Sequence, residues 1–220
     1  MRFASLFTLI INLYVCGVYG VTWYFLEYNP SGSGQYFTEF SGTMEIPTLP
    51  QAGVYYLWPG LQPTDNSGVY QNVLDGRSGT WWLGSGWCCS NPSLAWGSGF
   101  NIDGGDTATF SNVKGTGNWT STLTKGSTGD TVTDNFALTS KNFNQAIFAI
   151  ELYDETWDFG SLTFTDVTIV ATGSDSSTWC DTTPTNYNNA AEFTVSGATA
   201  TVSGTTVTCH IDTVELIGPA

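Results

Sequence analysis

The stretch QAIFAIELY, residues 145–153, combines the apolar pattern of a β-strand with a single carboxylate. Successive side chains of a strand point to opposite faces, so Phe148 and Ile150 point one way and Ala149 and Glu151 the other. An unpaired charge is prohibitively unfavourable in a protein interior, so Glu151 must be hydrogen-bonded, protonated or catalytic. The small side chain of Ala149 leaves room for a substrate beside it. Glu151 is therefore the first candidate for a functional residue.

The rest of the chain repeats short β-rich runs between clusters of Gly, Pro, Asn and Ser, with 25 glycines, 15% aromatic residues and no long helical period. This pattern predicts an all-β fold, an antiparallel two-sheet β-sandwich. Residues 84–104 and 173–189 are expected to be irregular. The expected strands are residues 22–28, 35–46, 54–58, 69–74, 80–83, 107–113, 119–125, 131–138, 145–153, 161–171, 192–194, 199–202 and 205–214.

Residues 1–20 have the pattern of a secretory signal peptide: Arg2 is followed by an apolar run, residues 6–15, and by the small residues Gly17 and Gly20. The run is too short to span a bilayer comfortably, and no later one approaches that length. We expect residues 21–220 to form a single β-sandwich domain, secreted to the extracellular space.

The formal net charge is -14, and the chain has only five Lys and Arg residues. Such a surface repels nucleic-acid phosphates and anionic lipid, which argues against nucleic-acid and membrane partners. Strong acidity also suits a protein that works in an acidic medium, although ordinary solubility explains it equally well. We expect a monomer.

Four cysteines remain once Cys16 leaves with the signal, namely Cys88, Cys89, Cys180 and Cys209. An even set in an oxidising compartment predicts two disulfides, and three pairings are possible. Adjacent cysteines rarely bond each other because the geometry is strained. Cys88 and Cys89 are therefore each expected to reach a distant partner.

His210 is the only histidine of the chain, which argues against a zinc site and against Ser-His-Asp chemistry. We interpret it as structural and expect no metal and no cofactor. Asn118-Trp119-Thr120 is a sequon for N-glycosylation, so a glycoprotein is predicted.

Residues 146–151, AIFAIE, match the form A-x-F-x-I-E, and at this point the chain resembles the eqolisins, glutamic peptidases of the scytalidoglutamic and aspergilloglutamic type. The resemblance implies that Glu151 is the catalytic glutamate. The family's catalytic glutamine lies about a dozen residues after a Trp-x-Gly-Ile segment. Here residues 58–61, WPGL, precede Val69-Tyr70-Gln71, so Gln71 takes that position.

Residues 105–107 with 132–136, residues 159–168 and residues 202–209 also resemble eqolisin segments. The implied fold is a bent sandwich of two antiparallel sheets, close to concanavalin-like lectins and glucanases. Two positions depart from the family: Gln62 stands where an acid is expected, and the glutamate of the aromatic strand is missing from residues 81–83. These departures imply altered substrate contacts.

The resemblance implies a secreted acid endopeptidase that acts on polypeptides. The glutamate would act as general base on a water, and the glutamine would donate a hydrogen bond to the oxyanion. The alternative is that Gln71 and Glu151 are neighbouring polar groups that satisfy each other in a protein without peptidase activity.

A second hypothesis rests on the tryptophans crowded into residues 80–100. Flat aromatic rings on a sandwich can stack on sugars, so a polysaccharide is the alternative partner, bound in a lectin-like manner or degraded. The same rings can instead line a peptide cleft, fill the core or cover a disulfide. The predicted substrate-binding residues are Trp58, Trp81, Trp82 and Trp87.

Glycosidase or lyase chemistry would need a second carboxylate across the cleft from Glu151. The chain offers Glu39 and Glu45 on a neighbouring predicted strand as examples. Either residue, placed opposite Glu151, would favour that chemistry.

Overall fold

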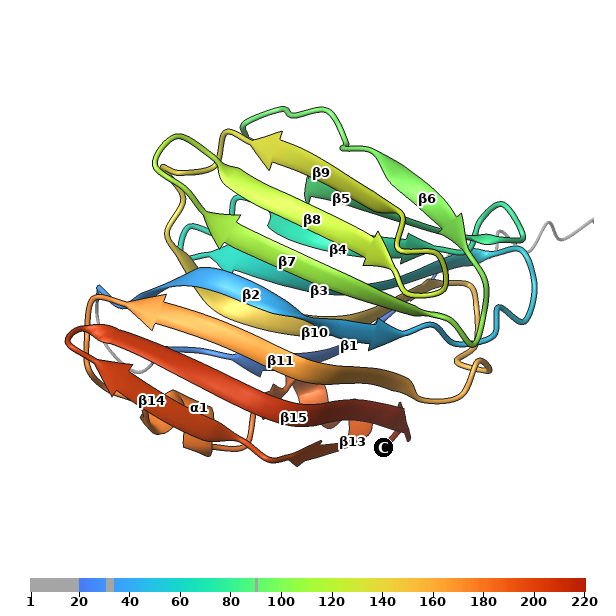
Figure 1. Ribbon diagram of the computed structural model, residues 1–220. Coiled ribbons are helices and arrows are strands. Elements are labelled where there is room, and N and C mark those ends of the chain that lie inside the picture. Colours follow the sequence, from blue (N-terminus) through green and yellow to red (C-terminus); the bar gives the residue numbers. More distant parts are fainter. Residues whose placement is uncertain (1–19, 31–33, 90) are drawn as a thin grey trace, which may run out of the picture.

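Two antiparallel sheets contain nearly all the strands of the protein (Figure 1). The computed structural model describes residues 20–30, 34–89 and 91–220. The first sheet has the order β12 (Thr185–Asn186), β1 (Val21–Tyr28), β10 (Phe143–Tyr153), β3 (Val54–Pro63), β4 (Val69–Asp75), β5 (Trp81–Cys88) and β6 (Gly99–Ile102).

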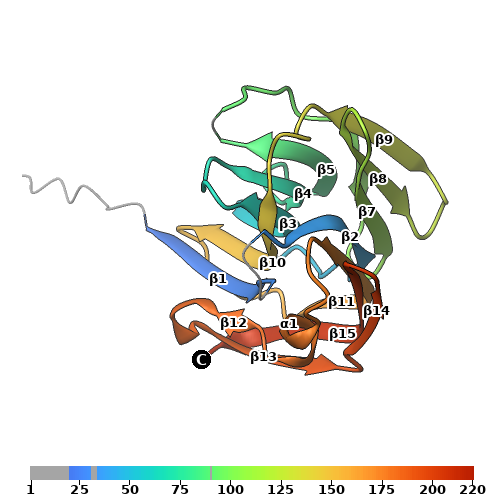
Figure 2. The same ribbon diagram turned by 90° about the vertical axis from the view of Figure 1, so that its left-hand side faces the viewer.

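The second sheet has the order β13 (Ala191–Ser196), β15 (Thr206–Pro219), β11 (Leu162–Thr172), β2 (Tyr36–Glu45), β7 (Thr107–Lys114), β8 (Trp119–Lys125) and β9 (Thr131–Phe136), and β14 (Thr199–Ser203) pairs with β15. Two short helices, α1 (Thr178–Asp181) and the 3-10 helix η1 (Tyr187–Asn189), precede β13. Figure 2 shows the sheets as two layers. The predicted all-β, two-sheet sandwich is confirmed.

The core between the two sheets is built by the alternation predicted for residues 145–153. Ala146, Phe148, Ile150 and Leu152 belong to the buried cluster between the sheets. Phe148 lies at its centre and is fully buried, with ring centroids 4.8 Å from Phe164, 5.2 Å from Phe40 and 6.4 Å from Tyr28. The alternate side chains of β10 face away from the core, on the open face of the first sheet.

Residues 84–104, predicted to be irregular, contain two strand segments. β5 continues to Cys88, and β6 occupies Gly99–Ile102. The strand signal is weak because Gly84 and Gly86 have no side chain and glycine usually weakens a strand. A Cβ on Gly84 would overlap the ring of Trp82, and one on Gly86 would overlap Trp96. Glycine is therefore required here by the aromatic rings that lie on the strand.

A buried polar network links the two sheets behind β4. The Asn72 amide donates to Ser85 Oγ and to Ser121 Oγ, both at 2.9 Å. Asn112 Nδ2 donates to Asn72 Oδ1 at 2.6 Å, and the two serine hydroxyls lie 2.7 Å apart. All four side chains are at most 1% exposed. Because satisfied buried polar groups specify one packing arrangement, this network fixes the position of β4 against the second sheet.

Replacing Asn72 by leucine is expected to lower the free energy of unfolding by about 2–4 kcal/mol, because the buried Asn112 amide loses its partner. The free energy is measured by urea denaturation. The double variant Asn72→Leu/Asn112→Leu is expected to lose less than the sum of the two single variants, since no orphaned amide is left. Additive losses would show that the two amides are not coupled.

One disulfide joins two of the four described cysteines. Cys180 in α1 pairs with Cys209 in β15, with sulfurs 2.04 Å apart and both residues buried. Cys88 and Cys89 remain beside each other at the end of β5. The expectation that each of these adjacent cysteines reaches a distant partner is therefore wrong: Cys180 and Cys209 lie close enough to bond each other.

Three further predictions concern the ends and surface of the chain. The predicted signal peptide, residues 1–20, lies outside the described residues except for Gly20, and so does Cys16. Within residues 20–30, 34–89 and 91–220, no helix is long and apolar enough to cross a membrane. Asn118 lies partly exposed in the turn between β7 and β8. Its glycosylation stays a prediction.

Candidate functional site

A cavity of about 1040 Å³ opens on the face of the first sheet that points away from the core. Its lining includes Glu151 and Tyr153 from β10, Gln71 from β4 and Trp82 from β5. The alternation of β10 explains this placement, because Ile147, Ala149, Glu151 and Tyr153 share the open face. Ile147 and Ala149 form a small apolar floor there together with Trp58 and Val73.

Strand pairing aligns six side chains in one row across the open face, which we call the central row. Trp23 of β1 pairs with Glu151, Glu151 with Tyr56 of β3, and Tyr56 with Asp75 of β4. Asp75 in turn pairs with Trp82, and Trp82 with Asn101 of β6. Neighbouring strands lie about 4.8 Å apart, so the row crosses the sheet at right angles to the strands. All its members except Trp23 line the cavity.

The Glu151 carboxylate accepts three hydrogen bonds. Oε1 accepts from the Tyr153 hydroxyl at 2.6 Å and from Trp23 Nε1 at 3.2 Å, and Oε2 accepts from Trp58 Nε1 at 3.4 Å. The donors come from three neighbouring strands and hold the carboxylate in one orientation. Oε1 is the more heavily engaged oxygen, so Oε2 is the one left for a further partner.

Tyr153 stays a donor over a wide pH range. Its hydrogen bond to Glu151, together with burial, raises the pKa of Tyr153 to about 12. A phenol with a raised pKa keeps its proton at all lower pH values, so the hydrogen bond to Glu151 persists through acidic and neutral solution. Burial raises the pKa of Tyr56, the neighbour of Glu151 in the central row, as well.

Gln71 faces the same cavity and is only 7% exposed. Its neighbours across the sheet are Gly60 on β3 and Gly86 on β5, which bring no side chain of their own to its flanks. In the described part of the chain, its side-chain amide has no hydrogen-bond partner. Because this amide borders the cavity, a ligand or water there can accept a hydrogen bond from Gln71.

Gln71 and Glu151 share the cavity without touching. They lie two strands apart, and their partners on β3, Gly60 and Tyr56, are four residues apart, which is about 13 Å along the strand. No hydrogen bond joins the two side chains among the described residues. The alternative that they merely satisfy each other is therefore wrong.

The four predicted substrate-binding tryptophans separate into two groups. Trp58 and Trp82 lie on the open face, where Trp58 bonds Glu151 and Trp82 lines the cavity. Trp81 and Trp87 point into the core: Trp81 Nε1 donates to the Pro47 carbonyl at 2.7 Å, and both rings are at most 4% exposed. The strand period of two explains the split, and it removes Trp81 and Trp87 from the site.

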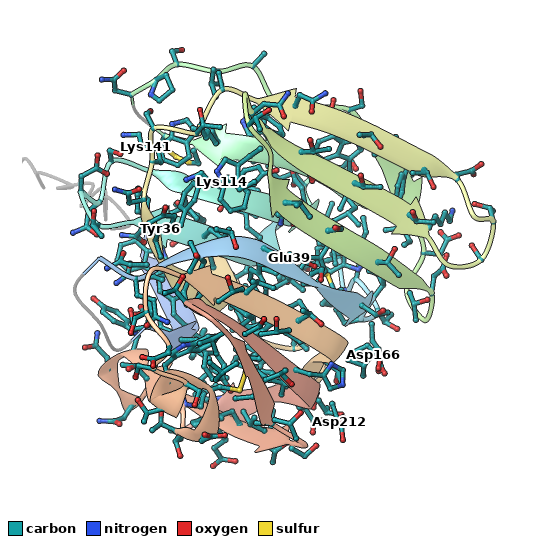
Figure 3. The ribbon with its side chains drawn as sticks, turned by 60° about the vertical axis from the view of Figure 1, so that its left-hand side comes forward. Tyr36, Glu39, Lys114, Lys141, Asp166 and Asp212 are labelled. Carbon is teal, nitrogen blue, oxygen red and sulfur yellow. A yellow bond between two sulfur atoms is a disulfide. The ribbon has the colours of Figure 1, made fainter. Side chains whose placement is uncertain are left out.

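The second carboxylate of the cavity is Asp75, which the sequence did not single out. Glu39 and Glu45, the two acids considered from the sequence, lie on β2 in the opposite sheet (Figure 3), so neither is across from Glu151. Asp75 forms a bidentate ion pair with Arg77, at 2.7 Å from Nη2 and 2.9 Å from Nε. The Arg77 guanidinium also lies 5.5 Å from the centroid of the Tyr56 ring.

The sequence signal for these residues was weak because their placement depends on strand pairing. Tyr153 is detectable, since it shares the predicted face of Glu151. Asp75, Arg77 and Asn101 reach the cavity only through pairing with strands distant in sequence.

The histidine of the chain, His210, lies away from this cavity. It is on β15 of the second sheet, with Nε2 3.3 Å from Oδ1 of Asp212, which Figure 3 labels. Within the described ranges, no group of three or more His, Cys, Asp or Glu side chains is placed to hold a metal ion.

Solved structures with the same fold include a scytalidoglutamic peptidase with a peptide-based transition-state analogue, at 21% identity and a TM-score of 0.52. The same peptidase with a transition-state analogue inhibitor is 19% identical with a TM-score of 0.50. A member of the eqolisin family in complex with the tripeptide Ala-Ile-His is 21% identical with a TM-score of 0.49. Each comparison covers 88% of this chain and 99% of the other. The chain therefore has the sandwich fold of the eqolisin peptidases.

In sequence, the chain matches no family model and no curated protein.

Proposed function

We propose that this protein is an acid endopeptidase of the glutamic type, with Glu151 as general base and Gln71 as oxyanion donor. The single observation that carries the proposal is that one cavity holds both an oriented carboxylate and an amide without a partner. The fold supports it, because a scytalidoglutamic peptidase of similar fold was solved with a peptide-based transition-state analogue.

In this mechanism a water lies between Glu151 and the carbonyl of the bond to be cleaved. Oε2, the less engaged oxygen, takes a proton from the water while the water oxygen attacks the carbonyl carbon. The carbonyl oxygen becomes an oxyanion and accepts a hydrogen bond from the Gln71 amide. Glu151 then returns the proton to the leaving amine as the C–N bond breaks.

Trp23, Trp58 and Tyr153 serve as positioning residues. Their hydrogen bonds to Glu151 hold the carboxylate toward the cavity before substrate arrives. A group that is already oriented does not have to reorient during the reaction, whereas the water molecules around the same reaction in solution do.

The test is cleavage of an unfolded protein by the purified chain between about pH 2 and 5, where carboxyl groups titrate. Gln71→Ala is expected to reduce kcat about 10²- to 10³-fold, as loss of one oxyanion donor does. Gln51→Ala is the matched control, because Gln51 is exposed, lies outside the cavity lining and donates its hydrogen bond to Glu155. No cleavage by folded wild type, or equal activity of the two variants, would contradict the proposal.

A polysaccharide remains the second candidate substrate because Trp82 and the exposed Trp96 line the same cavity. Asp75 and Glu151 are two strands apart, about 10 Å between backbones, which is compatible with a pair of glycosidase carboxylates. Both oxygens of Asp75 are held by Arg77, however, which leaves the acid poorly placed to activate a water. This ion pair favours the peptidase over the glycosidase.

We further propose that the protein acts outside the cell as a monomeric domain. The disulfide between Cys180 and Cys209 supports an oxidising compartment. The acidic surface suits a medium in which carboxylates are partly protonated.

A further inference from the structure

Two indole rings cover the part of the cavity that lies over β5, three strand intervals from β10. Trp82 lies over Gly84 and Gly99, and Trp96 lies over Gly86, since a Cβ on any of these glycines would overlap the ring. Rings that lie on the backbone in this way present their other face outward. Trp96 is 45% exposed and lines the cavity together with Trp82, so its ring is accessible to a ligand there.

The distance between this pair and Glu151 follows from the sheet. Trp82 and Glu151 belong to the same central row and are separated by three strand intervals, about 14 Å. An extended peptide advances about 3.3 Å per residue, so 14 Å corresponds to about four residues. A peptide that crosses the strands from Glu151 toward β5 therefore brings a side chain about four positions from the cleaved bond onto Trp82.

Polar and charged side chains line the part of the cavity between Glu151 and the two indole rings. Tyr56, Asp75 and Arg77 lie there, and the ion pair and the phenol suit the backbone and polar side chains of a peptide. The part of the cavity over β5 offers flat apolar surface in Trp82 and Trp96. An aromatic side chain fits it best, because stacked aromatic pairs gain attraction beyond the area they bury.

We propose that Trp82 and Trp96 form a subsite that selects an aromatic side chain about four residues from the cleaved bond. The inference rests on the proposed peptidase function and deepens it by naming the substrate preference. The two rings bind and orient the substrate and take no part in the bond-breaking step.

The experiment is digestion of a mixed peptide library, with cleavage sites identified by mass spectrometry. Wild type is expected to enrich Phe, Tyr and Trp at one fixed position about four residues from the cleaved bond. Trp82→Ala and Trp96→Ala are expected to lose the enrichment. On a single aromatic peptide, KM should rise about 10-fold with kcat little changed, the size expected for one stacked and buried ring.

Two further variants sharpen the test. Gly84→Ala keeps the Trp82 indole but displaces it, so it should weaken the enrichment without removing a tryptophan. Tyr36→Ala is the control, since this aromatic residue lies on β2 of the opposite sheet beside Lys114 (Figure 3) and should leave the preference intact.

Each contrary result has its own meaning. Cleavage without aromatic enrichment, or enrichment that survives both tryptophan variants, would overturn the subsite while leaving the peptidase function in place. No cleavage of any peptide by folded wild type would overturn both. Binding of soluble glucan fragments that disappears in Trp82→Ala, with no aromatic preference among peptides, would replace the peptide subsite by a sugar platform.

Discussion

Replacing Glu151 by glutamine is expected to lower kcat for peptide cleavage about 10²- to 10⁴-fold, the contribution of a positioned general base. Glutamine has nearly the same shape, so the cavity should keep its volume. It cannot accept a proton from water, and its amide nitrogen cannot accept hydrogen bonds as a carboxylate oxygen does. The measurement is the initial rate on an unfolded protein between about pH 2 and 5, with folding checked by circular dichroism.

The matched control is Glu45→Gln, which removes an exposed carboxylate at the end of β2 in the other sheet. It makes the same change in net charge but leaves the cavity untouched, so its rate should equal that of wild type. If the Glu151 variant retains more than about a tenth of the wild-type kcat, the general-base role is excluded. If the two variants fall together, the loss reflects charge rather than the site.

Phe148→Ala is expected to lower the free energy of unfolding by about 3–5 kcal/mol, the usual loss for a large-to-small change in a core. The ring is fully buried on β10 among Phe40, Phe164 and Tyr28. Urea denaturation measures this free energy. An unchanged dependence of the free energy on urea concentration would show that the unfolded state is unaffected.

Phe148→Leu serves as the partial change and should lose clearly less, because it removes less volume. If Phe148→Ala lowered the free energy of unfolding by less than about 1 kcal/mol, the two sheets would have to move together and fill the cavity left by the ring. That result would contradict the close packing inferred for this core. Activity measured well below the unfolding transition should change little in either variant, since Phe148 faces away from the cavity.

Which side chains of β10 face the core was predictable from sequence, because the alternation within this strand alone determines it. A period of two over residues 145–153 assigns Phe148 to the core and Glu151 to the open face without knowledge of the neighbours. The same rule, applied to β5, would separate Trp81 from Trp82. The strand pattern of β5 was hard to recognise because Gly84 and Gly86 are typical of a loop. The Trp82 and Trp96 rings that lie on these glycines explain why they occur in a strand.

The rest of the site depends on pairing between distant segments. Asp75 faces Glu151 across Tyr56 only because β4, β3 and β10 adopt one register, and a shift by one residue would turn Asp75 to the other face. Cys88 and Cys89 were misassigned for a related reason. Cys180 and Cys209 bond each other because α1 lies against β15, and local spacing does not determine that.

Strand β1 supplies Trp23 to the carboxylate of Glu151 and is tied to β10 along its whole length. Its first residue lies next to Gly20, whose backbone N–H donates to Asp154 Oδ1 just beyond Tyr153. The C-terminal residue Ala220 sits instead beside Ala190 at the edge of the opposite sheet (Figure 1). Trimming of the chain into β1 would therefore remove a hydrogen bond from Glu151 itself, whereas a purification tag at the C-terminus lies at the edge of the opposite sheet.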